Sequence, residues 1–170
     1  MKPRPGKKRL ASDEVDPGAL DLGHLSLFVG HALAEAVLGE VAAAGHAGLR
    51  VSHGYVFQHL IGAARTVGEL GERLQVSQQA ASKVIAELES LGYVERTADA
   101  GDGRVRRVQL TDRGEQAVAA ARAARSAIDR RLARRCGADA LETTRQTLAR
   151  VLDELGGTDA VRHRRVVAPR

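Results

Sequence analysis

The spacing of apolar residues predicts a mainly helical chain that opens with a long helix. From Asp21 to about Ala44, apolar residues recur at three- and four-residue intervals, which places them on one face of a helix. A second face of the same stretch carries His24, Phe28 and His31. A helix with two such faces is expected to pack against two partners, for example its own domain and a second subunit.

Three shorter helices are expected to follow. The first spans residues 49–61, the second begins at Thr66, and the third runs from Ser77 to about Leu91. Glu69 stands three residues after Thr66, which is the spacing of a capping box, and Ser77 is a favourable N-cap residue. The third helix is expected to bury one face, made of Ala81, Val84, Ile85 and Leu88.

A hairpin and two further helices complete the predicted order. Strands are expected over residues 93–96 and 105–110, with a turn-rich segment between them. Thr111 is expected to begin a long helix that ends near Arg135, and Asp139 a last helix that ends at Leu155. The predicted organisation is a flexible basic arm (1–18), an N-terminal dimerisation helix (19–48), a winged helix-turn-helix domain (49–110), C-terminal dimerisation helices (111–157) and a basic tail (158–170).

Two helices joined by a tight turn and followed by a two-stranded hairpin define a winged helix-turn-helix, so the predicted fold class is mainly α (α+β). The helix from Ser77 buries one face and leaves the other free, and such a helix fits the major groove of DNA. Gln78, Gln79 and Lys83 are therefore expected to meet base edges, and Ser77 and Ser82 to contact phosphates.

The predicted hairpin offers a second contact with DNA. Arg104 lies at its tip beside Asp102, and Arg106 follows on the returning strand. An arginine that projects from a thin hairpin can enter the narrow minor groove, where the negative potential is strongest. Asp102 is expected to hold Arg104 by a charge-assisted hydrogen bond.

The composition of the chain indicates the class of its partner and its cellular compartment. The formal charge is +5 and the isoelectric point about 10, which suits a polyanionic partner without proving one. Cys136 is the only cysteine, so we expect no internal disulfide and a cytoplasmic location. We see no run of about 18 apolar residues and expect no membrane partner. The basic arm is either a solvated tail or an arm that follows DNA phosphates.

The stretch from Leu49 to Gly114 resembles the multiple-antibiotic-resistance regulator (MarR) family. The resemblance rests on an ordered series of motifs: Ser82–Lys83 in the recognition helix, Leu91-Gly92-Tyr93-Val94 at its exit, Asp102 and Arg104 in the wing, and Val108, Leu110, Thr111 and Gly114 after it. It implies a homodimer that binds a pseudo-palindromic operator, usually as a repressor, and responds to a small molecule.

The sequence departs from the family pattern at four positions. Gly71 stands where alanine is usual, which weakens its helix but permits close packing. Gln75 occupies a turn position often held by glycine, so we expect mild strain there. Lys83 replaces a more usual arginine, and Gly54 replaces a bulkier residue.

The resemblance also implies an effector pocket where the first two helices meet the winged domain. The residues expected near it are His24, His31, His53, Gly54 and Phe57. His53 lies on the apolar face of its helix, and Gly54 leaves side-chain volume unfilled, as in a small-ligand site. The alternative is that His53 bonds to a backbone carbonyl and Gly54 only allows close helix packing.

Other functions are less well supported by the residues. The histidines lack the spacing of a metal site, and Cys136 is more simply a small residue near a helix end than a redox sensor. We find no phosphate loop, nucleophile motif or paired carboxylates, and therefore expect neither an enzyme nor a cofactor. A winged helix used for protein–protein assembly is the alternative from another class.

Overall fold

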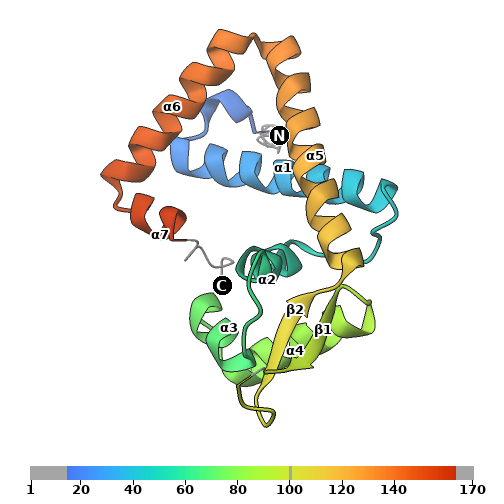
Figure 1. Cartoon of the computed structure of the whole chain (residues 1–170). Helices are drawn as coiled ribbons and strands as arrows, with labels where there is room; N and C mark the ends of the chain where they lie inside the picture. The colour runs from blue at the N-terminus through green and yellow to red at the C-terminus, as the bar shows by residue number, and fades with distance from the viewer. Residues whose placement is uncertain (1–14, 100, 164–170) are drawn as a thin grey trace, which may run out of the picture. The chain divides into compact units, whose positions relative to one another are not determined.

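The computed structural model describes residues 15–99 and 101–163, which form two compact units divided after Leu33 (Figure 1). The first contains a short 3-10 helix, η1 (Pro17–Ala19), and the beginning of α1 (Leu22–Ala43). The second contains the end of α1 and then α2 (Val51–Leu60), α3 (Val67–Leu74), α4 (Gln78–Ser90), β1 (Val94–Ala98), β2 (Arg106–Leu110), α5 (Asp112–Cys136), α6 (Ala138–Glu154) and α7 (Thr158–Arg162).

The predicted helix starts are confirmed where a side chain caps the backbone. Thr66 and Glu69 form the reciprocal capping box of α3, at 2.7 and 3.2 Å. Ser77 accepts from the N–H of Ala80 at the start of α4, and Thr111 caps α5 in the same way. These local hydrogen bonds fix the helix boundaries that the sequence predicted.

The turn between α3 and α4 is tight and carries the predicted strain. Gln75 adopts the left-handed conformation (φ 53°, ψ 40°), which a side chain disfavours. A Cβ on the buried Gly71 would lie 3.2 Å from the carbonyl oxygen of Val76 and 3.5 Å from the Cα of Gln78. The missing side chain at Gly71 therefore lets the turn close onto α3.

The hairpin completes the winged helix and closes its core. β1 and β2 are antiparallel, with Val94 opposite Leu110 and Ala98 opposite Arg106. Arg65 adds a third backbone partner by pairing with Val108. The core that these elements enclose contains Val56, Phe57, Leu60, Leu70, Ile85, Leu88, Tyr93, Val94, Val108 and Ala117.

The junction between the hairpin and α5 is closely fastened. The backbone N–H of Thr111 donates to the carbonyl of Tyr93 (3.1 Å), and its hydroxyl donates to the carbonyl of Gly92 (2.7 Å). A Cβ on Gly114 would collide with the carbonyl oxygen of Tyr93. Only glycine therefore allows the first turn of α5 to lie this close to the start of β1.

Two expectations about the C-terminal part were wrong in detail. Asp139 does not cap the last helix, because α6 begins after Gly137 (φ 93°) and Asp139 lies in its first turn. The segment expected as a basic tail (158–170) begins with a helix, since Thr158–Arg162 forms α7, and residues 164–170 lie outside the described part of the chain. The sequence signal for a short helix was hidden by the Gly156 and Gly157 pair that ends α6.

The expectation about apolar runs was also wrong. By length and composition, α1 is apolar enough to cross a membrane, and it is the one such helix among the described residues. Glu35 and Glu40 are its only charged residues, and its many glycines and alanines do not interrupt an apolar segment. Phe28 is 56% exposed and Leu27 61% exposed, so this helix presents apolar surface to solvent.

Candidate nucleic-acid interface

The free face of α4 carries the residues expected to read DNA. Ala81, Ile85 and Leu88 hold the helix in the core with at most 1% exposure. Gln78, Gln79 and Lys83 are exposed, whereas Ser82 is half-buried. The Ser77 oxygen accepts from the helix backbone, which leaves its hydroxyl hydrogen free to donate to a phosphate.

The wing tip is ordered by two carboxylates. Asp99 accepts from the backbone N–H groups of Gly101 (2.8 Å) and Asp102 (3.1 Å). Asp102 accepts from the N–H of Arg104 (3.0 Å), so the expected bond forms with the backbone and leaves the Arg104 guanidinium exposed. The tip therefore presents a cation from a backbone that is already fixed.

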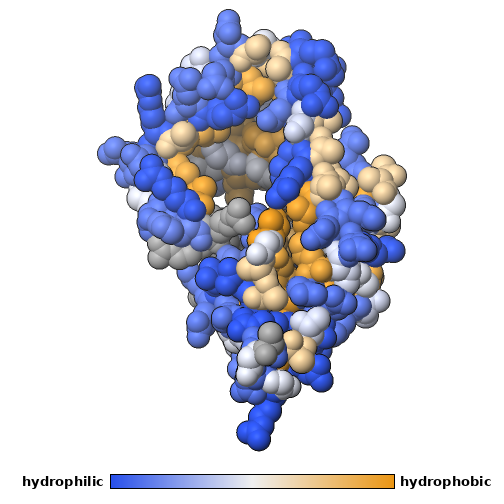
Figure 2. Space-filling model, in the orientation of Figure 1, coloured by the Kyte–Doolittle hydropathy of each residue, from blue (hydrophilic) through white to orange (hydrophobic). Residues whose placement is uncertain are grey.

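The side chains of Arg106 and Arg107 project from opposite faces of β2. Within the described residues, Arg107 is the one that forms an ion pair. Arg107 forms an ion pair with Asp99 and lies 3.7 Å from Glu69 of α3. Hydrogen bonds from Arg107 and from the turn backbone lower the pKa of Asp99 to about 2. Arg106 is exposed, like Arg104. In Figures 1 and 2, hydrophilic residues cover the end of the molecule where the hairpin projects beside α4.

A polar cluster that the sequence did not predict connects α2 to α4. Arg50, just before α2, forms an ion pair with Glu87 of α4. His53 is fully buried, and its Nδ1 accepts from the backbone N–H of Arg50 (3.2 Å), while its Nε2 lies 3.6 Å from Glu87. Burial lowers the pKa of His53, Arg50 lowers it further, and Glu87 opposes them.

The predicted effector residues lie in different environments. His24 and His31 are exposed on α1, where His24 bonds to Asp21 (2.6 Å). Phe57 belongs to the core cluster, and a Cβ on Gly54 would meet no atom within 4 Å. His53 bonds to the backbone, as in the alternative interpretation, although to an N–H group. The effector pocket stays a prediction.

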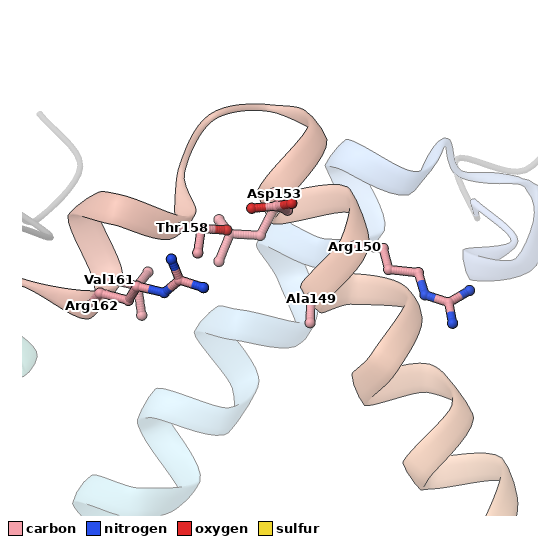
Figure 3. Close-up of a pocket in the computed structure, with 7 residues that line it drawn as sticks. Ala149, Arg150, Asp153, Thr158, Val161 and Arg162 are labelled. Atoms are coloured by element: carbon pink, nitrogen blue, oxygen red, sulfur yellow. The ribbon is translucent and has the colours of Figure 1, made fainter.

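The structure also shows an open concavity between α6 and α7 (Figure 3). Its wall includes Leu152 and Val161, and in Figure 3 the Arg162 side chain reaches toward α6 while Arg150 points away. Within residues 15–99 and 101–163, no group of three or more histidine, cysteine or acidic residues is placed to hold a metal ion. The α4 face and the wing are thus the better candidate site.

These observations define the class of the protein: it has a winged helix-turn-helix fold, as the sequence predicted. The MarR family model matches residues 47–105 of the chain, which contain α2, α3, α4 and β1 and end before β2. This part of the chain is therefore similar to the MarR family, and the resemblance found in the sequence is confirmed for it. No curated protein matches the chain.

Solved structures of the same fold extend the likeness beyond the winged helix. MepR, a transcription regulator of the Staphylococcus aureus multidrug efflux pump MepA, is 17% identical, with a TM-score of 0.64 over 80% of this chain and 99% of its own. MarR from E. coli is 22% identical (TM-score 0.61; 78% and 97%). The repressor CouR, solved on a 23-mer DNA duplex, is 24% identical (TM-score 0.61; 82% and 99%). The chain thus contains nearly the full length of each neighbour and has additional residues of its own.

Proposed function

We propose that the protein is a homodimeric transcription regulator that binds double-stranded DNA in a sequence-specific manner. The observation that carries this proposal is the exposed polar face of α4 beside a wing that presents Arg104 and Arg106. The similarity to the MarR family and the likeness to a repressor solved on a DNA duplex support it. The fold alone supports no enzymatic activity, and we propose none.

The roles of the residues follow from their positions. Gln78, Gln79 and Lys83 read base edges in the major groove, because they lie exposed in the first two turns of α4. Ser77 and Ser82 position the helix through phosphates. Arg104 enters the minor groove, with Asp102 fixing the backbone beneath it and Arg106 supporting it from the strand.

A second copy of the chain is proposed to pack against α1, α5 and α6 and to cover the apolar surfaces of α1 and α6. Exposed apolar residues recur on α1 and α6, and Leu148 and Leu152 are about 40% exposed. A two-fold dimer would place two recognition helices about 34–36 Å apart, which suits a pseudo-palindromic operator. Covering by a partner also explains an apolar helix α1 without a membrane.

Repression and relief by a small effector complete the proposal. MepR has been solved with ethidium bromide, so the fold accepts a small aromatic cation in that protein. In this chain His53, Gly54 and Phe57 of α2 are proposed to line the effector pocket. Gly54→Leu would fill the open volume beside α2, and would abolish release by an effector while DNA binding persists.

Selection from a pool of random duplexes tests the central proposal. The purified protein is expected to enrich a pseudo-palindromic motif. Gln79→Ala should change the bases preferred in that motif, whereas Ser82→Ala should weaken all sequences alike. Failure of the wild-type protein to enrich any motif would favour the assembly alternative.

Arg104→Ala tests the wing. The variant is expected to lose about 1–3 kcal/mol of operator affinity and to reduce the salt slope by roughly one ion. Arg162→Ala on α7 is the control, because it removes an exposed arginine outside both the winged helix and the helices proposed to form the dimer. Equal effects of the two substitutions would remove the wing from the mechanism.

A further inference from the structure

The cluster of Arg50, His53 and Glu87 connects the start of α2 to the exposed helix of the proposed interface. Glu87 lies in the last turn of α4, on the same helix as Gln79 and Lys83. It is held from outside by Arg50 and from inside by the buried His53. A carboxylate held on two sides limits how far α4 can rotate or slide against α2.

We propose that His53 and Glu87 position the recognition helix α4, and that a proton on His53 loosens this attachment and weakens DNA binding. The proposal rests on the proposed DNA-binding function of α4. His53 and Glu87 are positioning residues here, because His53 is buried and Glu87 lies in the last turn of α4, beyond the residues in the first two turns that are proposed to touch DNA.

The hydrogen bonds determine which nitrogen of His53 carries the proton. Nδ1 accepts from the Arg50 backbone N–H, so it carries no hydrogen. The neutral ring therefore carries its hydrogen on Nε2, which lies 3.6 Å from the Glu87 carboxylate. The Arg50 Nη2, 3.2 Å from Nε2, is also a donor, and it donates to the same carboxylate. One ring thus completes the first turn of α2 and contacts α4.

A protonated His53 cannot both accept the hydrogen bond from the Arg50 backbone N–H and keep its contact with Glu87. A second proton must go to Nδ1, where it would point at the Arg50 N–H, and two donors would face each other. The charged ring would also lie beside the Arg50 guanidinium, whose Nη2 is 3.2 Å from Nε2. Among the described residues, Arg50 and Glu87 are the charged groups that act on the ring. The charged state therefore favours opening of the first turn of α2.

The direction of the pH effect follows from burial. The pKa of His53 in the folded protein lies below its usual value of 6.5. The neutral ring therefore contributes its full stabilisation above pH 6.5, and this contribution is lost as the pH falls through 6.5 toward the lowered value. Glu87 attracts the charged ring, but burial and Arg50 outweigh this attraction, so the attachment of α4 should weaken over the same range.

His53→Gln separates positioning from simple packing. His53 is the third residue of α2 (N3), the position that glutamate or glutamine occupies in a capping box. A glutamine there can accept from the backbone N–H through its oxygen while its amide donates to Glu87. It does not titrate. The variant is expected to bind DNA within about threefold of wild type near pH 8, and to lack the wild-type weakening near pH 5.5.

The experiment measures the dissociation constant of a fluorescein-labelled duplex by anisotropy between pH 5.5 and 8. The duplex carries the motif enriched by selection or, if none is enriched, a random sequence. The ratio of the wild-type to the His53→Gln constant is expected to rise about tenfold from pH 8 to 5.5. Taking a ratio cancels the other histidines and the general effect of pH on DNA. A ratio that does not change with pH overturns the proposal.

Glu87→Gln supplies the second arm, with Glu89→Gln as its control. Both glutamates are on α4, both are 36% exposed, and Glu89 is paired with Arg96 of β1 rather than with α2. The two variants change the net charge equally. Glu87→Gln is expected to bind DNA about tenfold more weakly than Glu89→Gln, and equal affinities would overturn the proposal.

Hydrogen exchange of α2 and α4 distinguishes failure of this inference from failure of the proposed function. Lowering the pH should reduce amide protection in both helices of wild type relative to His53→Gln, with or without DNA. Unchanged relative protection overturns the attachment itself. Reduced protection in a protein that binds no duplex overturns both DNA binding and its control by His53, while the attachment of α4 to α2 holds.

Discussion

The winged helix and the terminal helices differ in how much of their apolar surface is exposed to solvent. Within the winged helix, Leu70, Ile85, Leu88 and Val108 are all completely buried. In α1 and α6, by contrast, large apolar side chains remain exposed, and just beyond α6 Leu155 is 79% exposed. The winged helix closes its own core, whereas α1 and α6 leave large apolar side chains exposed, which is the surface proposed to bind a second copy.

The largest expected effect comes from placing a charge on the uncovered surface. Phe28→Glu should prevent association, because each protomer loses about 1.5–3 kcal/mol of apolar burial and gains a charge to desolvate. Two copies lose twice this amount, so the dimer dissociation constant should rise more than about a hundredfold. Sedimentation velocity over a concentration series measures it. Val76→Glu, in the turn between α3 and α4, adds the same charge at an exposed apolar residue outside α1, α5 and α6 and should leave the dimer unchanged.

The converse substitution acts on the closed core. Ile85→Ala should lower the free energy of unfolding of the winged helix by about 2–5 kcal/mol, because a buried side chain is removed and a cavity remains. Leu148→Ala on α6, where the side chain is 40% exposed, should cost the isolated protomer far less and act mainly on association. Chemical unfolding of both variants at several concentrations compares them. Similar losses at the same concentration would abolish the distinction between the two regions.

A smaller effect is expected at the turn before α4. Gln75→Gly should stabilise the winged helix by up to about 1 kcal/mol, because glycine adopts the left-handed conformation without a Cβ penalty. Thermal unfolding measures the gain in stability, and the dissociation constant of the dimer should not change. Destabilisation would show that the Gln75 side chain makes a contribution larger than its strain.

The smallest effect is expected from acid at the wing. The pKa of Asp99 is lowered from 3.8 to about 2, so its stabilisation of the hairpin is present above about pH 4 and is lost as the pH falls toward 2. Amide exchange in β1 and β2 should increase over this range in wild type. In Asp99→Asn this acid-dependent increase should be absent, and its persistence would place the titrating group elsewhere.

What the sequence predicted depended on how local the interactions are. The caps at Thr66, Ser77 and Thr111 each involve residues three positions apart, and all three were found where the pattern placed them. The strain at Gln75 was visible for the same reason. The fold class followed from these local signals in the correct order.

The cluster around His53 could not be found in this way. Its contact with Glu87 joins residues 34 positions apart, and nothing in either local sequence marks the other. The apolar character of α1 was missed because the sequence analysis looked for an uninterrupted run of apolar residues. Glycine and alanine interrupt such a run, but they do not prevent the helix as a whole from being apolar. The exposure of the predicted DNA-reading residues is consistent with their roles, but their contacts with DNA stay predictions.

Because the first turn of α5 is fixed to the hairpin, this helix can act as a lever arm. Thr111 and Gly114 lock its first turn to the start of β1, so the hairpin and the near end of α5 move together. The helix has 25 residues, which at 1.5 Å per residue gives an arm of about 37 Å. A tilt of roughly five degrees about one end displaces the other by about 3 Å, close to the spacing of one base pair. Small rotations among the helices far from the wing are thereby converted into a change of register on the scale at which DNA sequence is read.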